Sequence, residues 1–482
     1  MNIVDPILFQ ARLNPEGLAI CTPGTVRSTV SYGQLVHLMN NIARRAIWEG
    51  LKSGDTAAIF VKDKIFHSAI ILALTRLGII TVSGRSIPFP RELKTDAVIS
   101  DGVRSVADGA KLIVVNPEWM EGDGKPMSDG RVYQGAADDV CRIVLTSGST
   151  GDAKGVAFTH RMITERNNRY LYIKGDRFSH SSRLFCDLGL ASNPGFRFLV
   201  YMLTKGGTIF FYGDSPESTL QAFGLYRIQN MFISTSGLAE YLKFFEAHSE
   251  FPCDFDHITT GGSVISKSMA QRVRARMSPL LYSAYGATEA CTMALAPLHA
   301  IEDTPGAVGW MTPDVTIDIV DESDRPVPHG KEGIVRVRSP YVVKQYVGDP
   351  PGGRYALRNG YFYPGDIGYL TEERLLVVLG RDNLVLNVGG DKVAPEIVEN
   401  VIGSFPRIND VAVFTHANEL GIPELYALIA SHEPIDEKAL LSHCGQRLER
   451  GFIPRHFVRV EKIPRNDAGK IERHRLAEVG KA

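Results

Sequence analysis

The chain lacks the features that mark several large protein classes. It has no Cys-x-x-Cys pair and no histidine at metal-ligand spacing from a cysteine, so neither a zinc site nor a disulfide framework is predicted. Its cysteines are scattered singly at positions 21, 141, 186, 253, 291 and 444. The most apolar stretch, residues 67–84, is interrupted by Arg76 and is too short to span a bilayer. The first seventeen residues lack a basic start followed by a long apolar run. A cytoplasmic protein without a membrane partner is therefore expected.

An excess of either charge is also missing. The 53 Lys and Arg residues balance 54 Asp and Glu residues, for a net charge of −1, and no basic stripe stands out along the sequence. Such a chain has no field to attract nucleic acid or an anionic membrane, so its predicted partners are small molecules or a protein carrier. A length of 482 residues with 44% hydrophobic content predicts two or more globular domains.

The hydrophobic pattern predicts an α/β fold. Apolar residues recur at helical spacing within residues 30–50, a strand-like run follows at 55–60, and residues 67–78 are again typical of a helix. Further strands are expected at 112–115, 141–145, 206–212 and 230–234, which indicates parallel sheets wrapped by helices. From about 295 to 380 the period changes to two, as in a small antiparallel subdomain, and the last hundred residues have an α+β pattern of their own.

One polar loop follows the strand predicted at 141–145. Residues 145–155, LTSGSTGDAKG, place glycines at 148, 151 and 155 among four hydroxyl residues and Lys154. Glycines let backbone N–H groups close on an anion, and the hydroxyls and the lysine add donors and charge, so the segment predicts a phosphate cradle. A P-loop is disfavoured because its second glycine and its magnesium-binding hydroxyl are missing. If the loop stood alone, a polar turn that binds nothing would be an equal alternative.

Four further segments complete a pattern in order along the chain. They are ITTGGS (258–263), YSAYGATEA (282–290), the pair YFYPGDIGYL (361–370) and GRDNLVLNVGGDKV (380–393), and IPRNDAGKIERHRL (463–476). With the loop, these segments resemble the adenylate-forming superfamily of acyl-CoA synthetases, aryl-CoA ligases, peptide-synthetase adenylation domains and luciferases. The resemblance covers nearly the whole chain.

The resemblance implies a large N-terminal domain, residues 1–382, and a small C-terminal lid domain, residues 383–482. The large domain would hold two doubly wound subdomains and a small β-barrel-like subdomain. The hinge would fall at Asn383, where related chains usually carry Asp or Lys. The implied reaction has two steps: a carboxylate attacks the α-phosphate of ATP to give an acyl-adenylate and pyrophosphate, and a thiol then displaces AMP.

The matched motif positions also carry implied roles. Lys470 would bridge the carboxylate and the α-phosphate, Thr288 would donate to that phosphate, and Glu289 would bind Mg²⁺. Tyr285 would lie against adenine, and Asp366 and Arg381 would hold the ribose. Gly389, Gly390 and Lys392 would line the thiol channel. The implied nucleotide site as a whole comprises Thr146, Ser147, Gly148, Ser149, Thr150, Gly151, Lys154, Gly261, Gly262, Ser263, Tyr285, Gly286, Asp366 and Arg381.

The acid pocket is the least determined part. Asn193, Phe196 and Ser236 are its candidate wall residues, although Phe196 could equally belong to the core. Many acyl-CoA synthetases place a histidine in the first of these segments, but this chain has none between His180 and His248. Peptide-synthetase domains hold a substrate ammonium with an aspartate there, and Asp187 is a weaker candidate for that role.

The function expected is ATP-dependent, AMP-forming acid–thiol ligation with ATP, Mg²⁺ and coenzyme A. No carrier domain follows the lysine motif, which favours coenzyme A as the acceptor. A separate carrier protein with a phosphopantetheine thiol stays open as the alternative acceptor, and a luciferase-like oxidation shares the first step. A protein of another class, a non-catalytic acyl or nucleotide sensor, is disfavoured by the intact Lys470, Glu289, Asp366 and Arg381.

Overall fold

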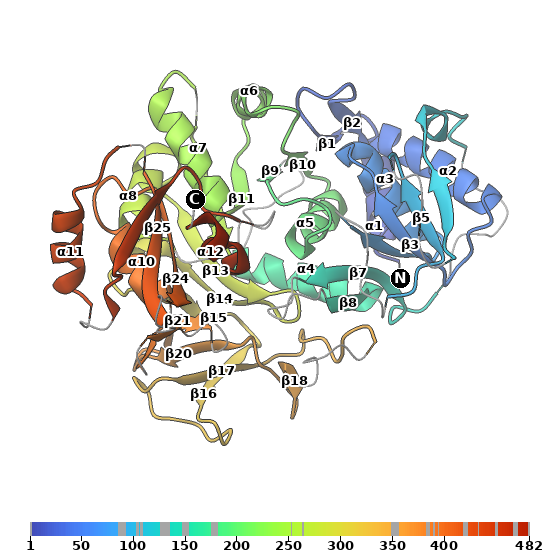
Figure 1. The fold of residues 1–482 in the computed structure, drawn as a ribbon. Coiled ribbons are helices and arrows are strands. Elements are labelled where there is room, and N and C mark those ends of the chain that lie inside the picture. The colour runs from blue at the N-terminus through green and yellow to red at the C-terminus, as the bar shows by residue number, and fades with distance from the viewer. Residues whose placement is uncertain are drawn as a thin grey trace.

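Two β-sheets and the helices that cover them hold most of the chain in the computed structural model (Figure 1). The structure describes residues 2–84, 93–102, 106, 109–125, 135–146, 154–174, 182–251, 253–262, 265–348, 356–381, 386–388, 391–393, 395–417, 423–431, 433–448, 452–465 and 471–480.

The N-terminal sheet has six strands in the order β6-β5-β3-β4-β7-β8, and all neighbours are parallel except β7 and β8. Its strands are β3 (Thr56–Phe60), β4 (Ile80–Ser83), β5 (Ala97–Ser100), β6 (Lys111–Val114), β7 (Val140–Thr146) and β8 (Lys154–Thr159). Strands β3 and β5 are apolar at almost every position because helices cover both faces of the sheet.

The larger sheet contains six parallel strands in the order β13-β12-β11-β9-β10-β1. These are β1 (Leu18–Cys21), β9 (Arg183–Cys186), β10 (Thr208–Phe211), β11 (Asn230–Ser234), β12 (His257–Gly261) and β13 (Leu281–Ala287), and β2 (Thr29–Ser31) is added antiparallel at the edge. The predicted α/β class is confirmed.

Beyond β13 the same sheet continues with antiparallel strands, as the period-two pattern predicted. They are β14 (Cys291–Pro297), β15 (Ala307–Met311), β16 (Thr316–Val320), β17 (Gly333–Arg338), β18 (Leu357–Arg358), β19 (Tyr361–Phe362), β20 (Asp366–Leu370) and β21 (Leu375–Arg381). The antiparallel subdomain is thus bonded directly to the parallel sheet through β13 and β14.

The C-terminal strands form a separate three-stranded sheet, β24-β25-β26, and a two-stranded ribbon, β22-β23. Their bounds are β22 (Leu386–Val388), β23 (Asp391–Val393), β24 (Asp410–Ala417), β25 (Pro423–Ala430) and β26 (His456–Val460). These elements bury hydrophobic clusters of their own, around Val413 and Leu428, and lie beside β21 in Figure 1. The predicted domain boundary at residue 383 falls outside the described residues and stays a prediction.

The helices are α1 (Asp5–Leu13), α2 (Tyr32–Trp48), α3 (Lys64–Arg76), α4 (His160–Lys174), α5 (Asn193–Thr204), α6 (Pro216–Tyr226), α7 (Thr235–Ala247), α8 (Lys267–Arg276), α10 (Pro395–Gly403), α11 (Glu437–Gly445) and α12 (Leu476–Val479). Short 3₁₀ turns are η1 (Pro117–Met120), η3 (Leu298–Ala300) and η6 (Arg473–Arg475). No helix in the described part of the chain has the length and apolar character needed to cross a membrane.

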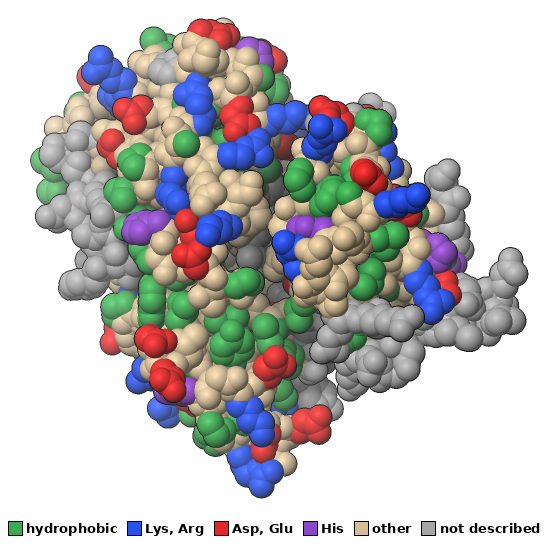
Figure 2. All heavy atoms as spheres, turned by 90° about the vertical axis from the view of Figure 1, so that its left-hand side faces the viewer, with side chains coloured by type: hydrophobic (Ala, Val, Ile, Leu, Met, Phe, Trp, Pro, Cys, Tyr) green, Lys and Arg blue, Asp and Glu red, His purple; other side chains and the backbone are tan. Residues whose placement is uncertain are grey.

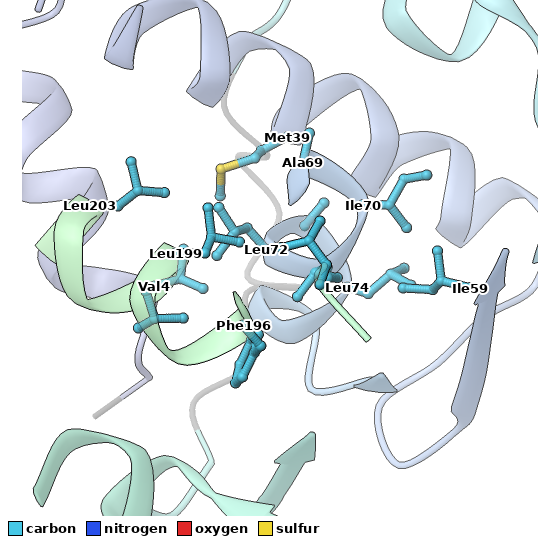
Figure 3. Packing of buried hydrophobic residues seen from close by; sticks show 14 of the residues in the cluster. Val4, Met39, Ile59, Ala69, Ile70, Leu72, Leu74, Phe196, Leu199 and Leu203 are labelled. Atoms are coloured by element: carbon cyan, nitrogen blue, oxygen red, sulfur yellow. The ribbon is translucent and has the colours of Figure 1, made fainter. Parts of the chain in front are cut away.

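Helix α5 lies at the centre of the largest hydrophobic core. Its N-terminus is fixed by the Ser192 hydroxyl, which accepts a 3.1 Å hydrogen bond from the Gly195 amide, and by Pro194 in the first turn. Leu199 and Leu203 then pack with Met39 of α2 and Leu72 of α3 (Figure 3). Burial of such side chains contributes about 1.5–3 kcal/mol each, so this core ties α5 firmly to the N-terminal helices.

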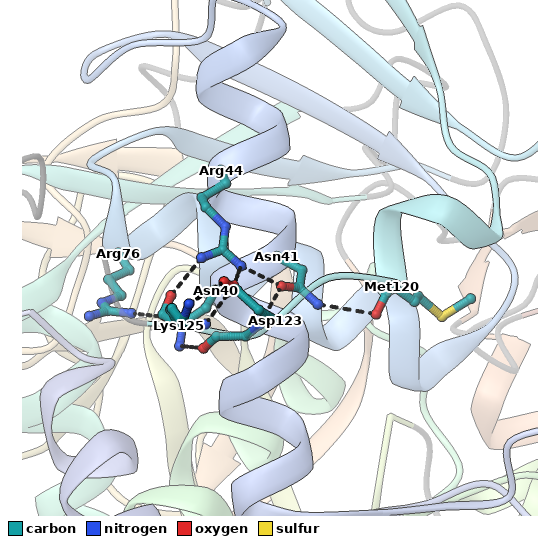
Figure 4. A network of polar contacts seen from close by, with 8 residues as sticks. Asn40, Asn41, Arg44, Arg76, Met120, Asp123 and Lys125 are labelled. Carbon is teal, nitrogen blue, oxygen red and sulfur yellow. Dashed lines mark hydrogen bonds and ion pairs between the residues drawn. The ribbon is translucent and has the colours of Figure 1, made fainter. Parts of the chain in front are cut away.

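A polar network joins α2 to the segment that follows η1 (Figure 4). The Asn40 amide donates to the Gly124 carbonyl at 2.8 Å, and its oxygen accepts from Arg76 at 2.8 Å. Asn41 donates to the Met120 carbonyl at 3.2 Å and accepts from Arg44 at 2.7 Å. Buried amides on α2 are thereby satisfied, and the 120–125 segment is held against the helix.

The surface fits the balanced composition. On the face drawn in Figure 2, basic and acidic side chains are interspersed without a broad patch of one sign.

Candidate active site

The predicted phosphate loop lies in the sequence between β7 and β8, which pair antiparallel. Thr146 ends β7 and Lys154 begins β8, with the Thr146 hydroxyl 3.4 Å from the Lys154 carbonyl oxygen. A strand before the loop and a helix after it were predicted, whereas β8 between the loop and α4 was not. Ser147, Gly148, Ser149, Thr150 and Gly151 lie outside the described residues, so their place in the cradle stays a prediction.

The residues around 343–347 close one side of this hairpin. The Val347 amide donates to the Gly155 carbonyl at 2.8 Å. A Cβ atom on Gly155 would lie only 3.1 Å from Cβ of Val347, so a glycine suits this close approach. The Lys154 ammonium lies 5.4 Å from the ring centroid of Tyr346, within range of a cation–π contact.

Tyr346 connects the hairpin to the predicted metal ligand. Its hydroxyl donates a 2.8 Å hydrogen bond to Glu289 Oε1, and both side chains are buried. Burial and the adjacent Glu289 raise the pKa of Tyr346, so the hydroxyl stays protonated and remains a donor. Tyr346 was not predicted from the sequence, because it lies in a segment without a motif or a clear hydrophobic period.

The carboxylate of Glu289 fits a single-ligand magnesium site. Mg²⁺ prefers hard oxygen ligands and keeps several waters, so one carboxylate together with phosphate oxygens can hold it. Among the described residues no cluster of three or more His, Cys, Asp or Glu side chains could hold a metal by itself. Glu289 would therefore share the ion with the nucleotide.

Two buried arginines of α4 hold the turn that carries Thr288 and Glu289. Arg166 donates to the carbonyls of Thr288 and Glu289, each at 2.9 Å, and also to the Tyr341 carbonyl. Arg169 donates to the Thr292 carbonyl at 2.9 Å and to the Pro313 carbonyl at 3.1 Å. The predicted helix after the loop included both residues, but the sequence gave no signal for their partners, which lie more than 120 residues away.

The predicted ribose and adenine residues converge on the end of β13. Asp366 and Arg381 lie directly opposite each other in the ladder of β20 and β21. The Asp366 carboxylate accepts a short hydrogen bond from the Tyr285 hydroxyl. The Arg381 side chain lies outside the described part of the chain, so its contact with ribose stays a prediction.

Three glycines border this point, and at two of them a neighbouring strand leaves no room for a side chain. A Cβ atom on Gly261 would lie 2.6 Å from the Ala284 carbonyl oxygen, and one on Gly286 would lie 2.5 Å from the Cys291 carbonyl oxygen. Gly262 has a φ of +96°, and a Cβ atom there would have no neighbour within 4 Å among the residues that the structure describes. The backbone just after β12 therefore lacks a side chain where a flat base could approach; Ser263, the next residue, is outside the described residues.

The remaining predicted residues divide into two groups. Lys470, Asn383, Gly389 and Gly390 lie outside the described residues. For Lys392 in β23 and Ser236 in α7 the backbone is described but the side chain is not.

The three acid-pocket candidates with described side chains behave differently. Asn193 begins α5 and is partly exposed. Phe196 is buried in the hydrophobic core, which is the alternative that the sequence left open for it. Its ring lies 4.8 Å from the Arg142 guanidinium. Asp187 follows β9; burial raises its pKa and Lys64 of α3 partly opposes that effect.

Comparison with known proteins agrees with this arrangement. The profile of the AMP-binding enzyme family matches residues 90–347, and that of the AMP-binding enzyme C-terminal domain matches residues 397–470. The chain is 27% identical to 2-succinylbenzoate–CoA ligase of Geobacillus kaustophilus, over 97% of this chain and 96% of that one. It is also 27% identical to D-alanine–D-alanyl carrier protein ligase of Bacillus licheniformis, over 99% of each chain.

Solved structures share the fold. O-succinylbenzoate coenzyme A synthetase (MenE) from Bacillus subtilis, in complex with ATP and a magnesium ion, superposes with a TM-score of 0.83 at 22% identity, over 98% of this chain and 99% of that one. The anthranilate CoA ligase AuaEII superposes with a TM-score of 0.86 at 18% identity, over 100% and 97% of the two chains. The resemblance drawn from the five motifs is confirmed: the chain belongs to the AMP-binding enzyme family.

Proposed function

We propose that this protein activates a carboxylic acid with ATP to an acyl-adenylate and then transfers the acyl group to the thiol of coenzyme A. The observation that carries the proposal is the convergence of motif residues from distant parts of the sequence. Tyr346 contacts both Lys154, through its ring, and Glu289, through its hydroxyl. The Tyr285 hydroxyl donates to Asp366, which lies opposite Arg381 in the β20–β21 ladder. The family membership and the CoA ligases among the relatives support it.

Each motif residue has a proposed part in this chemistry. Lys154 and the loop after Thr146 would bind phosphate oxygens, and Thr288 would donate to the α-phosphate. Tyr285, Gly261 and Gly262 would border the adenine, and Asp366 with Arg381 would accept and donate to the ribose hydroxyls. Mg²⁺ on Glu289 would neutralise phosphate charge. Catalysis then depends on positioning and charge neutralisation, with no protein nucleophile.

The C-terminal part is proposed to act as a lid. In this proposal residues 383–482 move as a unit about Asn383 and bring Lys470 to the carboxylate and the α-phosphate, and in the thiol-transfer state they place Gly389, Gly390 and Lys392 along the acceptor channel. The family profile of a C-terminal domain at 397–470 supports a separate unit there. A cytoplasmic location, where ATP and coenzyme A are at hand, belongs to the same proposal.

A carrier-protein thiol is the second candidate acceptor. The D-alanine–D-alanyl carrier protein ligase matches this chain over 99% of its length, so a related scaffold serves a carrier protein in that enzyme. Comparing acyl transfer to coenzyme A with transfer to a phosphopantetheinylated carrier protein separates the two acceptors.

The decisive experiment is pyrophosphate release from Mg·ATP across a panel of aliphatic, aromatic and amino acids. The Lys470→Ala variant should lower the rate of this step on the order of 10²-fold or more, because a cation about 4 Å from an anion contributes roughly 4 kcal/mol at an effective dielectric of 20. Thioester formation from supplied acyl-adenylate should suffer much less. Equal losses in both half-reactions would contradict the role of Lys470, and absence of pyrophosphate release with every acid would contradict the enzyme function.

A further inference from the structure

Four arginines of the described chain are buried, and three of them each donate to two or more neutral oxygen acceptors. Arg166 and Arg169 donate mostly to backbone carbonyls, as described above. Arg142 donates to the hydroxyls of Thr81 and Ser83 and to the Leu190 carbonyl. Several carbonyl and hydroxyl dipoles around each guanidinium offset the cost of removing it from water.

Arg197 of α5 is different. Its side chain is 7% exposed, and within the described residues its hydrogen bond goes to Cys291 Sγ, at 3.6 Å. The rings of Tyr170 and Phe198 lie 4.9 and 4.8 Å from the guanidinium carbon. No carboxylate of the described chain forms an ion pair with it. A guanidinium stays charged in a protein, so this group is a buried cation with most of its donor capacity unused.

The position of Arg197 connects this cation to the candidate active site. Cys291, its hydrogen-bond partner, begins β14 and lies two residues after Glu289. Arg197 is also four residues after Asn193, on the helix where the wall of the acid pocket was predicted. The neighbouring Phe198 ring lies 4.6 Å from Phe232 of β11, so aromatic rings border the guanidinium.

Two further guanidiniums reach the same turn: Arg166 donates to the Glu289 carbonyl and Arg169 to the Thr292 carbonyl, each at 2.9 Å. Together with Arg197 they concentrate positive charge around the start of β14. An uncompensated buried charge is strongly destabilising, so an anion from outside the chain would stabilise this region.

We propose that Arg197 binds a second anionic group of the acid substrate, and that this substrate is a dicarboxylate or an acid with a carboxylate on its tail. The inference rests on the proposed function and narrows it to a substrate class. One carboxylate reacts at the α-phosphate near Thr288 and Glu289, and the other accepts hydrogen bonds from Arg197 between the rings of Tyr170 and Phe198. A planar guanidinium can donate two parallel bonds to such a carboxylate.

The test compares each dicarboxylate with its own monomethyl ester, which keeps one reacting carboxylate and nearly the same length but lacks the second charge. Pyrophosphate release is measured with straight-chain diacids from malonate to suberate, with 2-succinylbenzoate, and with their monoesters. For at least one diacid the wild-type enzyme should show a kcat/KM about tenfold or more above that of its monoester, the worth of a charge-assisted hydrogen bond.

Substitutions then test whether Arg197 causes the preference for a diacid over its monoester. Arg197→Met should lose the diacid advantage while retaining activity with the monoester, and Arg197→Lys should keep part of it. Arg272→Met, at an exposed arginine of α8 paired with Glu246, is the matched control and should keep the full preference. Thermal unfolding of each variant separates loss of preference from loss of fold.

Three results would overturn the inference. A wild-type enzyme that activates monoesters as well as diacids throughout the panel has no second anion site. Equal losses for diacid and monoester in folded Arg197→Met would instead place Arg197 at the reacting carboxylate or in a purely structural role. The absence of pyrophosphate release with every acid, monocarboxylates included, would overturn the proposed function itself and this inference with it.

Discussion

Glu289 accepts a hydrogen bond from the Tyr346 hydroxyl, and this contact joins two residues that are 57 positions apart in the sequence. The tyrosine ring also lies over the Lys154 ammonium at the start of β8. One side chain therefore sets the distance between the proposed metal ligand and the proposed phosphate-binding lysine.

Replacing Tyr346 with Phe removes the donor to Glu289 and keeps the ring under Lys154. Partners that orient a metal ligand typically contribute 10–100-fold to metal affinity, so the Mg²⁺ concentration required for half-maximal pyrophosphate release should rise roughly tenfold. Tyr341→Phe is the control, since its hydroxyl reaches only Asp314 at 3.3 Å near the surface. An unchanged Mg²⁺ requirement in Tyr346→Phe would show that this contact does not orient the metal ligand.

Glu289→Gln replaces the carboxylate with an amide of the same shape. The Tyr346 hydroxyl can still donate to the amide oxygen, so thermal stability should stay near that of the wild type. The loss of one negative charge beside the metal should lower pyrophosphate release on the order of 10²-fold at a fixed Mg²⁺ concentration. Activity close to that of the wild type would remove Glu289 from the metal site.

Arg166→Met should destabilise the whole chain. The change removes the Arg166 donor from the carbonyls of Thr288, Glu289 and Tyr341, of which Glu289 keeps the Val343 amide, at a cost of roughly 2–4 kcal/mol in the free energy of unfolding. Urea unfolding of the wild type and the variant measures this loss of unfolding free energy. Arg325→Met is the comparison, because the exposed pair of Arg325 with Asp321 is worth less than about 1 kcal/mol. Similar midpoints for the two variants would mean that the carbonyl contacts of Arg166 contribute little.

His67 should make the folded state less stable at acid pH. The ring Nδ1 donates to the Val61 carbonyl and Nε2 accepts from the Ser83 hydroxyl, which itself accepts from Arg142. Burial, together with the charge of Arg142, lowers the pKa of His67 to about 3. The unfolded chain binds this proton below a pKa near 6.5, so stability is lost as the pH falls from about 6.5 toward 3.

Between pH 7 and pH 5 this single group should cost about 2 kcal/mol of unfolding free energy. His67→Gln cannot titrate and should remove that part of the pH dependence, as measured by urea unfolding at both pH values. Carboxylates elsewhere titrate equally in both proteins, so the difference between the two proteins isolates His67. Parallel pH profiles would show that His67 is not kept neutral in the folded state.

The fold was largely predictable because its signals are local. The helical spacing of Leu35, Leu38 and Met39 and the buried strands at 56–60 and 141–145 were recognised from apolar periodicity alone. The strand β8 was missed because Lys154 and Gly155 were interpreted as part of a phosphate loop, and the strand is defined by its pairing with β7. Pairing partners are not encoded in the period of a strand.

The site was predictable only where a motif carried it. Tyr285, Asp366 and Glu289 were predicted as site residues because short ordered segments surround them. Tyr346, Arg166 and Arg197 were not, since each acts through a partner far along the chain: Glu289, the Thr288 carbonyl and Cys291. A buried arginine in a helix has no sequence signature that separates it from a solvated one.

Strand β1 pairs in parallel with β10, matching Ile20 with Ile209 and Cys21 with Phe210. During synthesis this apolar strand must therefore wait, with one edge uncovered, until nearly two hundred further residues have left the ribosome. The early part of the chain is thus a natural client for chaperones that shield nascent polypeptides, and slower translation before residue 208 would lengthen the time it stays exposed to aggregation.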